Sequence, residues 1–461
     1  MTEEDLSRQV EAELALFEYP VTDWVRPVHG PVHNVVIVGG GQAGLAVAFG
    51  LRREHISGVV VLDENPEGLE GPWITYARMI TLRTLKFLTG PDLGLPSLTF
   101  RRWHAARYGT ASWDNLMRID KADWMRYLIW FRRTLKIPVR NNVRLRLLEP
   151  AGDLWTLHLE TPDGPEVLVT REVVLATGLE GGGARRVPDF VRDGLPRDVW
   201  AHTADKIDFP ALRGRRVAVM GGGASAYDNA ATALEHGAAH VEMFIRRDAV
   251  PMINPYRALE SSGFWGNFAD LDDATRWRFM HRLMSFPMPP PQDTVERVMR
   301  HANVSVHFGT PVLEARPGMR LRTPSGWHDA DFLILGTGFG VGLGARPELS
   351  AIAAAIDTWA DRHMSPGDAE MGRHPYVGPG FELRGGLPGL RRIRMFNGGS
   401  MVSTGPVSTG LNGMPFGLPR LIRHISLDFL RDQASGMLED FETYDEPDAW
   451  EAVRTDGESA A

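Results

Sequence analysis

Two glycine-rich turns, each between an apolar run and a helix-like run, constrain the fold of this chain more than any other feature. The first is Gly39-Gly40-Gly41-Gln42-Ala43-Gly44, and the second is Gly221-Gly222-Gly223-Ala224-Ser225-Ala226. Glycine at the first positions permits a tight turn and close approach of a pyrophosphate, and the helix that follows supplies amide groups. We therefore predict two Rossmann-like dinucleotide-binding units. Two ordinary tight turns would explain the glycines but not the matched positions of the charged residues that follow.

The residues that end the next apolar run differ in charge between the two units. Asp63 and Glu64 follow the run Val59 to Leu62, where a carboxylate accepts hydrogen bonds from ribose hydroxyls. Arg246 and Arg247 follow the run Val241 to Ile245, where paired guanidinium groups suit a 2′-phosphate. FAD in the first unit and NADPH in the second are the simplest cofactors that fit this difference.

The two turns also predict the domain organisation. Two apolar runs that end in Thr177-Gly178 and Thr337-Gly338 are predicted crossovers between the domains. The predicted fold class is α/β, with two Rossmann-like domains and an NADPH domain inserted into a discontinuous FAD domain. The predicted boundaries are 1–32 for an N-terminal appendage with an amphipathic helix, 33–204 for the first part of the FAD domain, 205–330 for the NADPH domain, 331–435 for the second part of the FAD domain, and 436–461 for an acidic tail.

Composition excludes several kinds of site. The chain has 461 residues and no cysteine, so it has neither a redox-active cysteine pair nor a cysteine-held iron–sulfur cluster. The histidines lack paired ligand spacing, so no metal is predicted. A net charge of −8 with scattered basic residues argues against a nucleic-acid partner. No apolar run reaches the roughly 18 residues of a membrane span. The acidic amino terminus favours a cytoplasmic protein. The sequence leaves open whether the chain forms a homo-oligomer.

Three stretches carry a pattern beyond the glycines themselves. The second turn, with Ser225 and Asp228, has the form G-x-G-x-S-x-x-D. A linker with Phe190, Gly194 and His202 is similar to F-x-G-x-x-x-H, although the histidine lies eight positions after the glycine instead of four. The stretch after the first ribose-binding run contains Gly71-Pro72-Trp73, Tyr76, Thr81-Leu82-Arg83-Thr84, Lys86, and Gly90-Pro91-Asp92-Leu93. In these motifs the chain resembles the class B flavoprotein monooxygenases, which include flavin-containing, N-hydroxylating and Baeyer–Villiger enzymes.

The resemblance implies a chemistry in which a flavin hydroperoxide transfers one oxygen atom of dioxygen to a small-molecule substrate. Amine N-hydroxylation is slightly favoured over ketone (Baeyer–Villiger) or sulfide oxygenation. An uncoupled NADPH oxidase is one alternative, and a flavin- and NADP-binding redox sensor without turnover is another. In such a scheme the cofactors carry the reaction, and the protein orients them and excludes water.

Three residues are candidates for contact with the reacting groups. The class usually has an asparagine near the flavin where this chain has Arg83 and its neighbours, so Arg83 or Lys86 is a candidate cation at the flavin edge. The alternative is that both face solvent or pair with carboxylates. Arg257 is a candidate partner for a substrate carboxylate, and a surface salt bridge is its alternative.

The full set of predicted cofactor contacts combines the two turns with isolated positions. Asn412 belongs to it because a helix that starts near Met414 would aim its N-terminus at the flavin. The set is Gly39, Gly41, Gln42, Ala43, Gly44, Asp63, Glu64, Trp73, Thr177, Gly178, Gly221, Gly223, Ala224, Ser225, Ala226, Arg246, Arg247, Thr337, Gly338 and Asn412.

Overall fold

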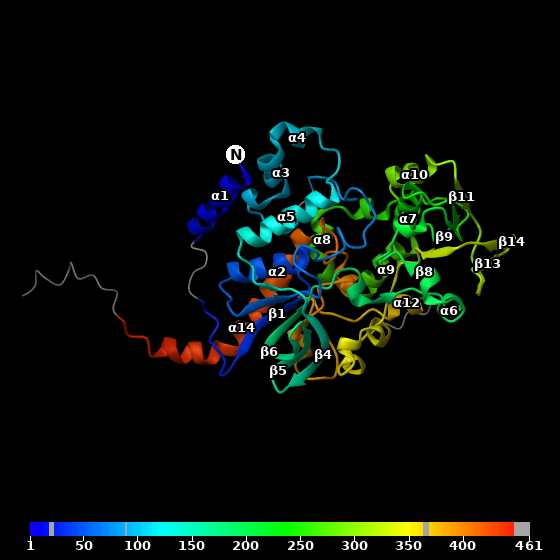
Figure 1. Ribbon diagram of the computed structural model, residues 1–461. Coiled ribbons are helices and arrows are strands. Elements are labelled where there is room, and N and C mark those ends of the chain that lie inside the picture. The colour runs from blue at the N-terminus through cyan, green and yellow to red at the C-terminus, as the bar shows by residue number, and fades with distance from the viewer. Residues whose placement is uncertain (18–22, 88–89, 363–367, 447–461) are drawn as a thin grey trace, which may run out of the picture.

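A computed structural model describes residues 1–17, 23–87, 90–362 and 368–446, and two sheets organise it (Figure 1). The order of the first sheet is β3-β2-β1-β6-β5-β4, with β17 beside β6. The strands β1, β2, β3, β6 and β17 pair in parallel, whereas β4 and β5 form an antiparallel meander with β6. The strands are β1 (Val32–Val38), β2 (Val59–Leu62), β3 (Val139–Arg140), β4 (Arg144–Ala151), β5 (Leu154–Thr161), β6 (Gly164–Leu175) and β17 (Ile393–Arg394).

The second sheet is entirely parallel, in the order β11-β10-β9-β15-β8. Its strands are β8 (Trp200–His202), β9 (Arg216–Met220), β10 (His240–Phe244), β11 (Val304–His307) and β15 (Phe332–Leu335). A small antiparallel sheet accompanies it and consists of β12 (Glu314–Arg316), β13 (Arg320–Thr323) and β14 (Gly326–Asp329). Figure 1 shows β13 and β14 at the outer side of this second unit.

The helices cover the sheets because the central strands are apolar on both faces. On β1, Val35 and Ile37 belong to the core that contains α2, α5 and α14, whereas Val36 belongs to the core on the other face. The helices are α1 (Glu3–Leu16), α2 (Gln42–Arg53), α3 (Phe100–Tyr108), α4 (Thr110–Asn115), α5 (Lys121–Thr134), α6 (Asp189–Arg192), α7 (Ala224–Glu235), α8 (Ser262–Asn267), α9 (Asp273–Ser285), α10 (Gln292–Met299), α11 (Trp359–Arg362), α12 (Ala369–Gly372), α13 (Met401–Thr404) and α14 (Met414–Glu442). Within the described ranges, no helix combines the length and apolarity needed to cross a bilayer.

The predicted α/β architecture with two Rossmann-like units is confirmed, and β17 and α14 return the chain to the first unit. Two strands lie across the predicted domain boundaries. β8 precedes residue 205 and β15 follows residue 330, yet both pair within the second sheet. The exact boundaries stay a proposal. Of the predicted acidic tail, residues 447–461 lie outside the described residues.

The predicted amphipathic helix at the N-terminus is α1, which begins at a capping box between Thr2 and Asp5. Its apolar side buries Leu6, Val10 and Leu14. It packs on α3 and α5, so residues 1–16 are part of the first unit's surface layer.

A buried ion cluster joins the C-terminal segment to the first sheet. Glu172 on β6 accepts a hydrogen bond from Arg392 Nη1 at 2.7 Å, and its other oxygen lies 3.3 Å from Arg394 Nε. Arg394 also pairs with Asp428 on α14. Burial raises the pKa of the Glu172 carboxyl, and the two guanidinium groups oppose that shift. These contacts hold β6, β17 and α14 together.

Replacing Arg394 by methionine should lower the free energy of unfolding by about 3–5 kcal/mol, because Glu172 and Asp428 would keep buried charges without that partner. Urea unfolding followed by circular dichroism would measure this. Arg133→Met is the matched control, since Arg133 pairs with Glu67 on the surface, and it should cost at most about 1 kcal/mol. Equal losses in the two variants would contradict a special role for the cluster.

Candidate functional site

The first glycine-rich turn connects β1 to α2 and leaves open space at one defined position. Gly39 has φ +109°, and a Cβ there would lie 2.5 Å from the Ala176 carbonyl oxygen. At Gly41 the nearest atom to such a Cβ is the Gly71 Cα at 4.0 Å. Gly41 is also the N-cap of α2 and offers no side chain to its amide groups. Gly39 therefore shapes the turn, whereas Gly41 leaves room for a ligand at a helix N-terminus.

The second turn has the same geometry between β9 and α7. Gly221 has φ +131°, and a Cβ there would lie 2.3 Å from the Gly336 carbonyl oxygen. At Gly223, the N-cap of α7, no atom of the described residues lies within 4 Å of such a Cβ. Ala226 ends the turn, and it fits because Gly336 opposite has no side chain.

Asp63, at the carboxyl end of β2, lies directly beside the first turn. One carboxylate oxygen accepts a 2.7 Å hydrogen bond from Gly40 N–H, and the other accepts one from Asn65 N–H at 2.8 Å. Burial raises the pKa of the Asp63 carboxyl, although these hydrogen bonds favour its charged form. Glu64 instead pairs with Arg144 at the surface. Contact of either residue with a ribose stays a prediction.

Two tryptophans connect predicted cofactor residues near the N-terminus of α2. Trp124 on α5 donates from Nε1 to Gln42 Oε1 at 3.2 Å. Trp73 meets the same Trp124 edge-on, with ring centroids 6.2 Å apart. Trp73 and the Gln42 side chain are therefore held beside the first turn through a shared aromatic neighbour.

A short two-stranded ribbon links the two Thr-Gly crossovers. It consists of β7 (Gly183–Arg185) and β16 (Phe339–Val341), which pair antiparallel. Gly338 O accepts hydrogen bonds from Arg186 N–H at 2.9 Å and from the ring of His202 at 3.0 Å. His202 Nδ1 accepts from Ala204 N–H, so Nε2 carries the proton in the neutral ring. Burial lowers the pKa of His202, which favours that neutral form.

The first crossover is held by residues that the sequence patterns did not single out as contacts. Asn397 Nδ2 donates to Thr177 Oγ1 at 3.1 Å, and Gly398 N–H donates to Gly178 O at 3.0 Å. His374, which lies in no recognisable motif, bonds Gly399 O at 3.1 Å, and burial lowers its pKa to about 4. Only the glycine-rich character of residues 397–400 could have drawn attention to this corner.

Arg246 and Arg247 follow β10 beside the second turn. Neither side chain forms an ion pair with any residue that the structure describes. Burial and the nearby Arg246 charge lower the pKa of Arg247, and the same two causes lower that of Arg186. Arg186 pairs with Glu370, so the unpaired positive charge at the carboxyl end of the second sheet comes from Arg246 and Arg247.

The three candidate catalytic residues have different neighbours. Arg83 donates to Asp228, a buried carboxylate on α7, at 3.1 Å. Lys86 Nζ donates to Trp113 O at 2.7 Å. Arg257 is exposed and forms no ion pair with the described residues. The surface salt bridge that was the alternative role for Arg257 is therefore not observed among them. A catalytic role for each stays a prediction. Asn412 is half-buried two residues before α14, which begins at Met414 as predicted.

Comparison with known proteins identifies a matching family and a relative of this chain. The model of the pyridine nucleotide-disulphide oxidoreductase family matches residues 36–258. The FAD-dependent urate hydroxylase of Xanthomonas campestris pv. campestris is 44% identical over 438 residues, which is 92% of each chain.

Solved structures share the fold at lower sequence identity. The ornithine N-hydroxylase of Kutzneria sp. 744, solved with reduced FAD, NADP+ and L-ornithine, has a TM-score of 0.68 at 18% identity, covering 86% of this chain and 100% of that chain. The flavin-containing monooxygenase of Stenotrophomonas maltophilia has a TM-score of 0.57 at 17% identity, covering 87% and 99%.

The two glycines of the second turn should respond differently to alanine. Gly221→Ala should lower the free energy of unfolding by about 2 kcal/mol or more, since it adds a backbone clash at positive φ. Gly223→Ala should cost at most about 1 kcal/mol, because alanine is a poorer N-cap than glycine. It should nevertheless weaken NADPH binding, because its methyl group fills the open space. Urea unfolding and calorimetric titration would measure the two effects. A Gly223→Ala chain that binds NADPH normally would show that the open space is not a phosphate site.

Proposed function

This chain belongs to the class B flavoprotein monooxygenases, and we propose that it hydroxylates urate. The proposed reaction inserts one oxygen atom of dioxygen into urate, with FAD as the resident cofactor and NADPH as the electron donor. Urate, O2, NADPH and a proton give hydroxylated urate, NADP+ and water. The observation that carries the proposal is the identity of 44%, across nearly the whole of both chains, with an enzyme named for urate hydroxylation.

The first turn fits the pyrophosphate of FAD. Open space at Gly41 and the uncapped amides of Gln42 and Ala43 suit two phosphate groups, and Asp63 is near enough to the turn to bond a ribose. When bound and reduced, FAD supplies the activation of dioxygen. The chain's own task is to orient the cofactor and to hold the backbone around Thr177 and Asn397 rigid.

The second turn with its arginines fits NADPH. Gly223 offers the same open space above α7, and Arg246 and Arg247 have guanidinium groups without ion-pair partners among the described residues. A 2′-phosphate would satisfy both positive charges with hydrogen bonds. This supports a preference for NADPH over NADH.

Arg257 is our candidate for substrate binding. Urate is a planar anion at neutral pH, and a guanidinium group can meet such an anion with two parallel hydrogen bonds. Arg257 is exposed on the 3-10 helix Pro255–Leu259, next to the half-buried Tyr256, whose ring stacks near Trp265. The guanidinium group suits the negative charge of urate, and the aromatic rings of the same segment suit its flat shape.

The decisive experiment follows NADPH, urate and hydrogen peroxide together in the purified yellow protein. We expect urate to disappear in a one-to-one ratio with NADPH, with little peroxide. L-ornithine, a ketone and a sulfide serve as parallel substrates, because amine N-hydroxylation, Baeyer–Villiger oxygenation and sulfide oxygenation are the alternatives within the class. NADPH oxidation with equal peroxide whether or not urate is present would instead indicate an oxidase. Failure of NADPH to reduce the flavin would indicate a redox sensor.

Replacing Arg246 and Arg247 together by alanine should weaken the binding of NADPH by about ten- to a hundredfold for each guanidinium group lost, since a charged hydrogen bond contributes about 1.5–3 kcal/mol. The affinity for NADH should stay nearly unchanged. Anaerobic flavin reduction at increasing coenzyme concentration would measure both affinities. Arg215→Ala is the control, because Arg215 is exposed at the opposite end of β9. Equal losses for the two coenzymes would exclude a 2′-phosphate contact.

A further inference from the structure

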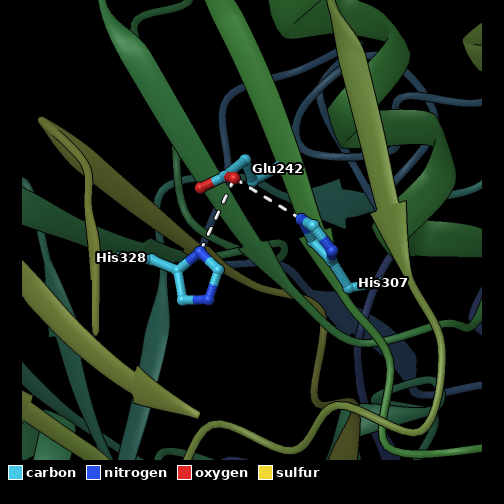
Figure 2. A group of neighbouring side chains, drawn as sticks. All are labelled: Glu242, His307 and His328. Carbon is cyan, nitrogen blue, oxygen red and sulfur yellow. Dashed lines mark ion pairs between the residues drawn. The ribbon is translucent and has the colours of Figure 1, made fainter. Parts of the chain in front are cut away.

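Three side chains from three strands converge beside the second sheet (Figure 2). Glu242 lies on β10, His307 on β11 and His328 on β14, and one ligand atom of each falls within 4.8 Å of the others. His307 Nε2 is 3.4 Å and His328 Nδ1 is 3.6 Å from the same oxygen, Glu242 Oε1. Figure 2 shows both imidazole rings directing a nitrogen at the carboxylate.

Two hydroxyl groups lie at the other nitrogen of His328. Its Nε2 is 3.2 Å from Thr323 Oγ1 and 3.4 Å from Ser325 Oγ, and the two hydroxyl oxygens are 2.8 Å apart. A hydroxyl group can accept a hydrogen bond from Nε2 as well as donate one to it. When Nε2 donates, the Nδ1 of the neutral ring presents a lone pair on the side of Glu242, which is the form of histidine that binds a metal ion.

His307 offers a second nitrogen from the other side of the carboxylate. Its Nε2 is buried and forms no hydrogen bond among the described residues, although Glu242 Oε1 lies 3.4 Å away. The ring stacks on Phe244 with centroids 5.3 Å apart, which restrains its orientation. A buried nitrogen without a hydrogen bond is costly, and an ion bound between it and the carboxylate would satisfy both.

We propose that Glu242, His307 and His328 bind a zinc ion, with a water molecule as the fourth ligand. Zinc takes nitrogen and oxygen ligands at about 2.0–2.2 Å in a tetrahedron, which sets neighbouring ligand atoms about 3.3 Å apart. The observed 3.4 and 3.6 Å separations are close to that value. The hydrogen bond from His328 to Thr323 supplies the outer contact that orients a metal-bound histidine.

The ion would join the small antiparallel sheet to the parallel sheet of the second unit. β14 belongs to the former, and β10 and β11 belong to the latter. The three ligands lie far apart in sequence, so a search for closely spaced histidine pairs does not find them. The proposal differs in this respect from the sequence analysis, which predicted no metal.

Zinc binding is tested with tag-free, flavin-loaded protein that has been treated with a chelator and dialysed against Zn²⁺. We expect one zinc per chain by mass spectrometry of the metal. Glu242→Gln, His307→Gln and His328→Gln should each weaken binding at least tenfold. His240→Gln is the matched control on β10, because His240 bonds Ser305 and lies outside the cluster, and it should bind zinc normally.

A second readout is the stability that the ion adds. Zn²⁺ should raise the thermal unfolding temperature of the unmodified chain and of His240→Gln but not of the three ligand variants, because a ligand that binds only the folded state stabilises it. Flavin content verifies that each variant is folded. Absence of zinc in the unmodified chain, or equal zinc binding by the ligand variants, would overturn the proposal.

Discussion

The nucleotide units depend on one backbone contact that occurs twice. In each, the first glycine of the turn lies against the carbonyl that follows the neighbouring strand: Gly39 against Ala176, and Gly221 against Gly336. That approach sets where the helix begins and also fixes the Thr-Gly crossover, because Thr177 and Thr337 come next in the chain. A side chain at the first glycine would separate strand, helix and crossover together.

The turns were predictable from sequence because their physics is local. Six consecutive residues determine a tight turn, an open position and a helix N-terminus. The length of the next strand then determines where the charged residue at its end lies relative to the turn. Even the alanine at 226 has a local explanation, since the residue opposite it is Gly336. The first helix was also readable, from the period of its buried residues.

Contacts between distant segments were not predictable in the same way. Glu172 and Arg394 each look like ordinary charged residues in sequence, and only the return of the chain to β6 buries them together. Asn397 holds the first crossover and His374 holds the neighbouring Gly399, and neither belongs to a motif. The predicted boundaries placed the strands β8 and β15 in the FAD domain, whereas both pair in the second sheet. A short apolar run predicts a strand but not the sheet in which that strand pairs.

The position of the two units relative to each other rests on charge as well as on the β7–β16 ribbon. Arg83, in the loop after the first unit's β2, donates to Asp228 on α7, the helix that begins at the second turn. Burial raises the pKa of the Asp228 carboxyl, and Arg83 and Arg297 oppose that shift. Asp228 is therefore stabilised by cationic neighbours from outside its own helix. Displacing the Arg83 loop would leave this buried carboxylate without one of its cationic partners, which is destabilising. Two cofactors that exchange electrons need their binding turns held at a fixed separation, and this ion pair contributes to that restraint.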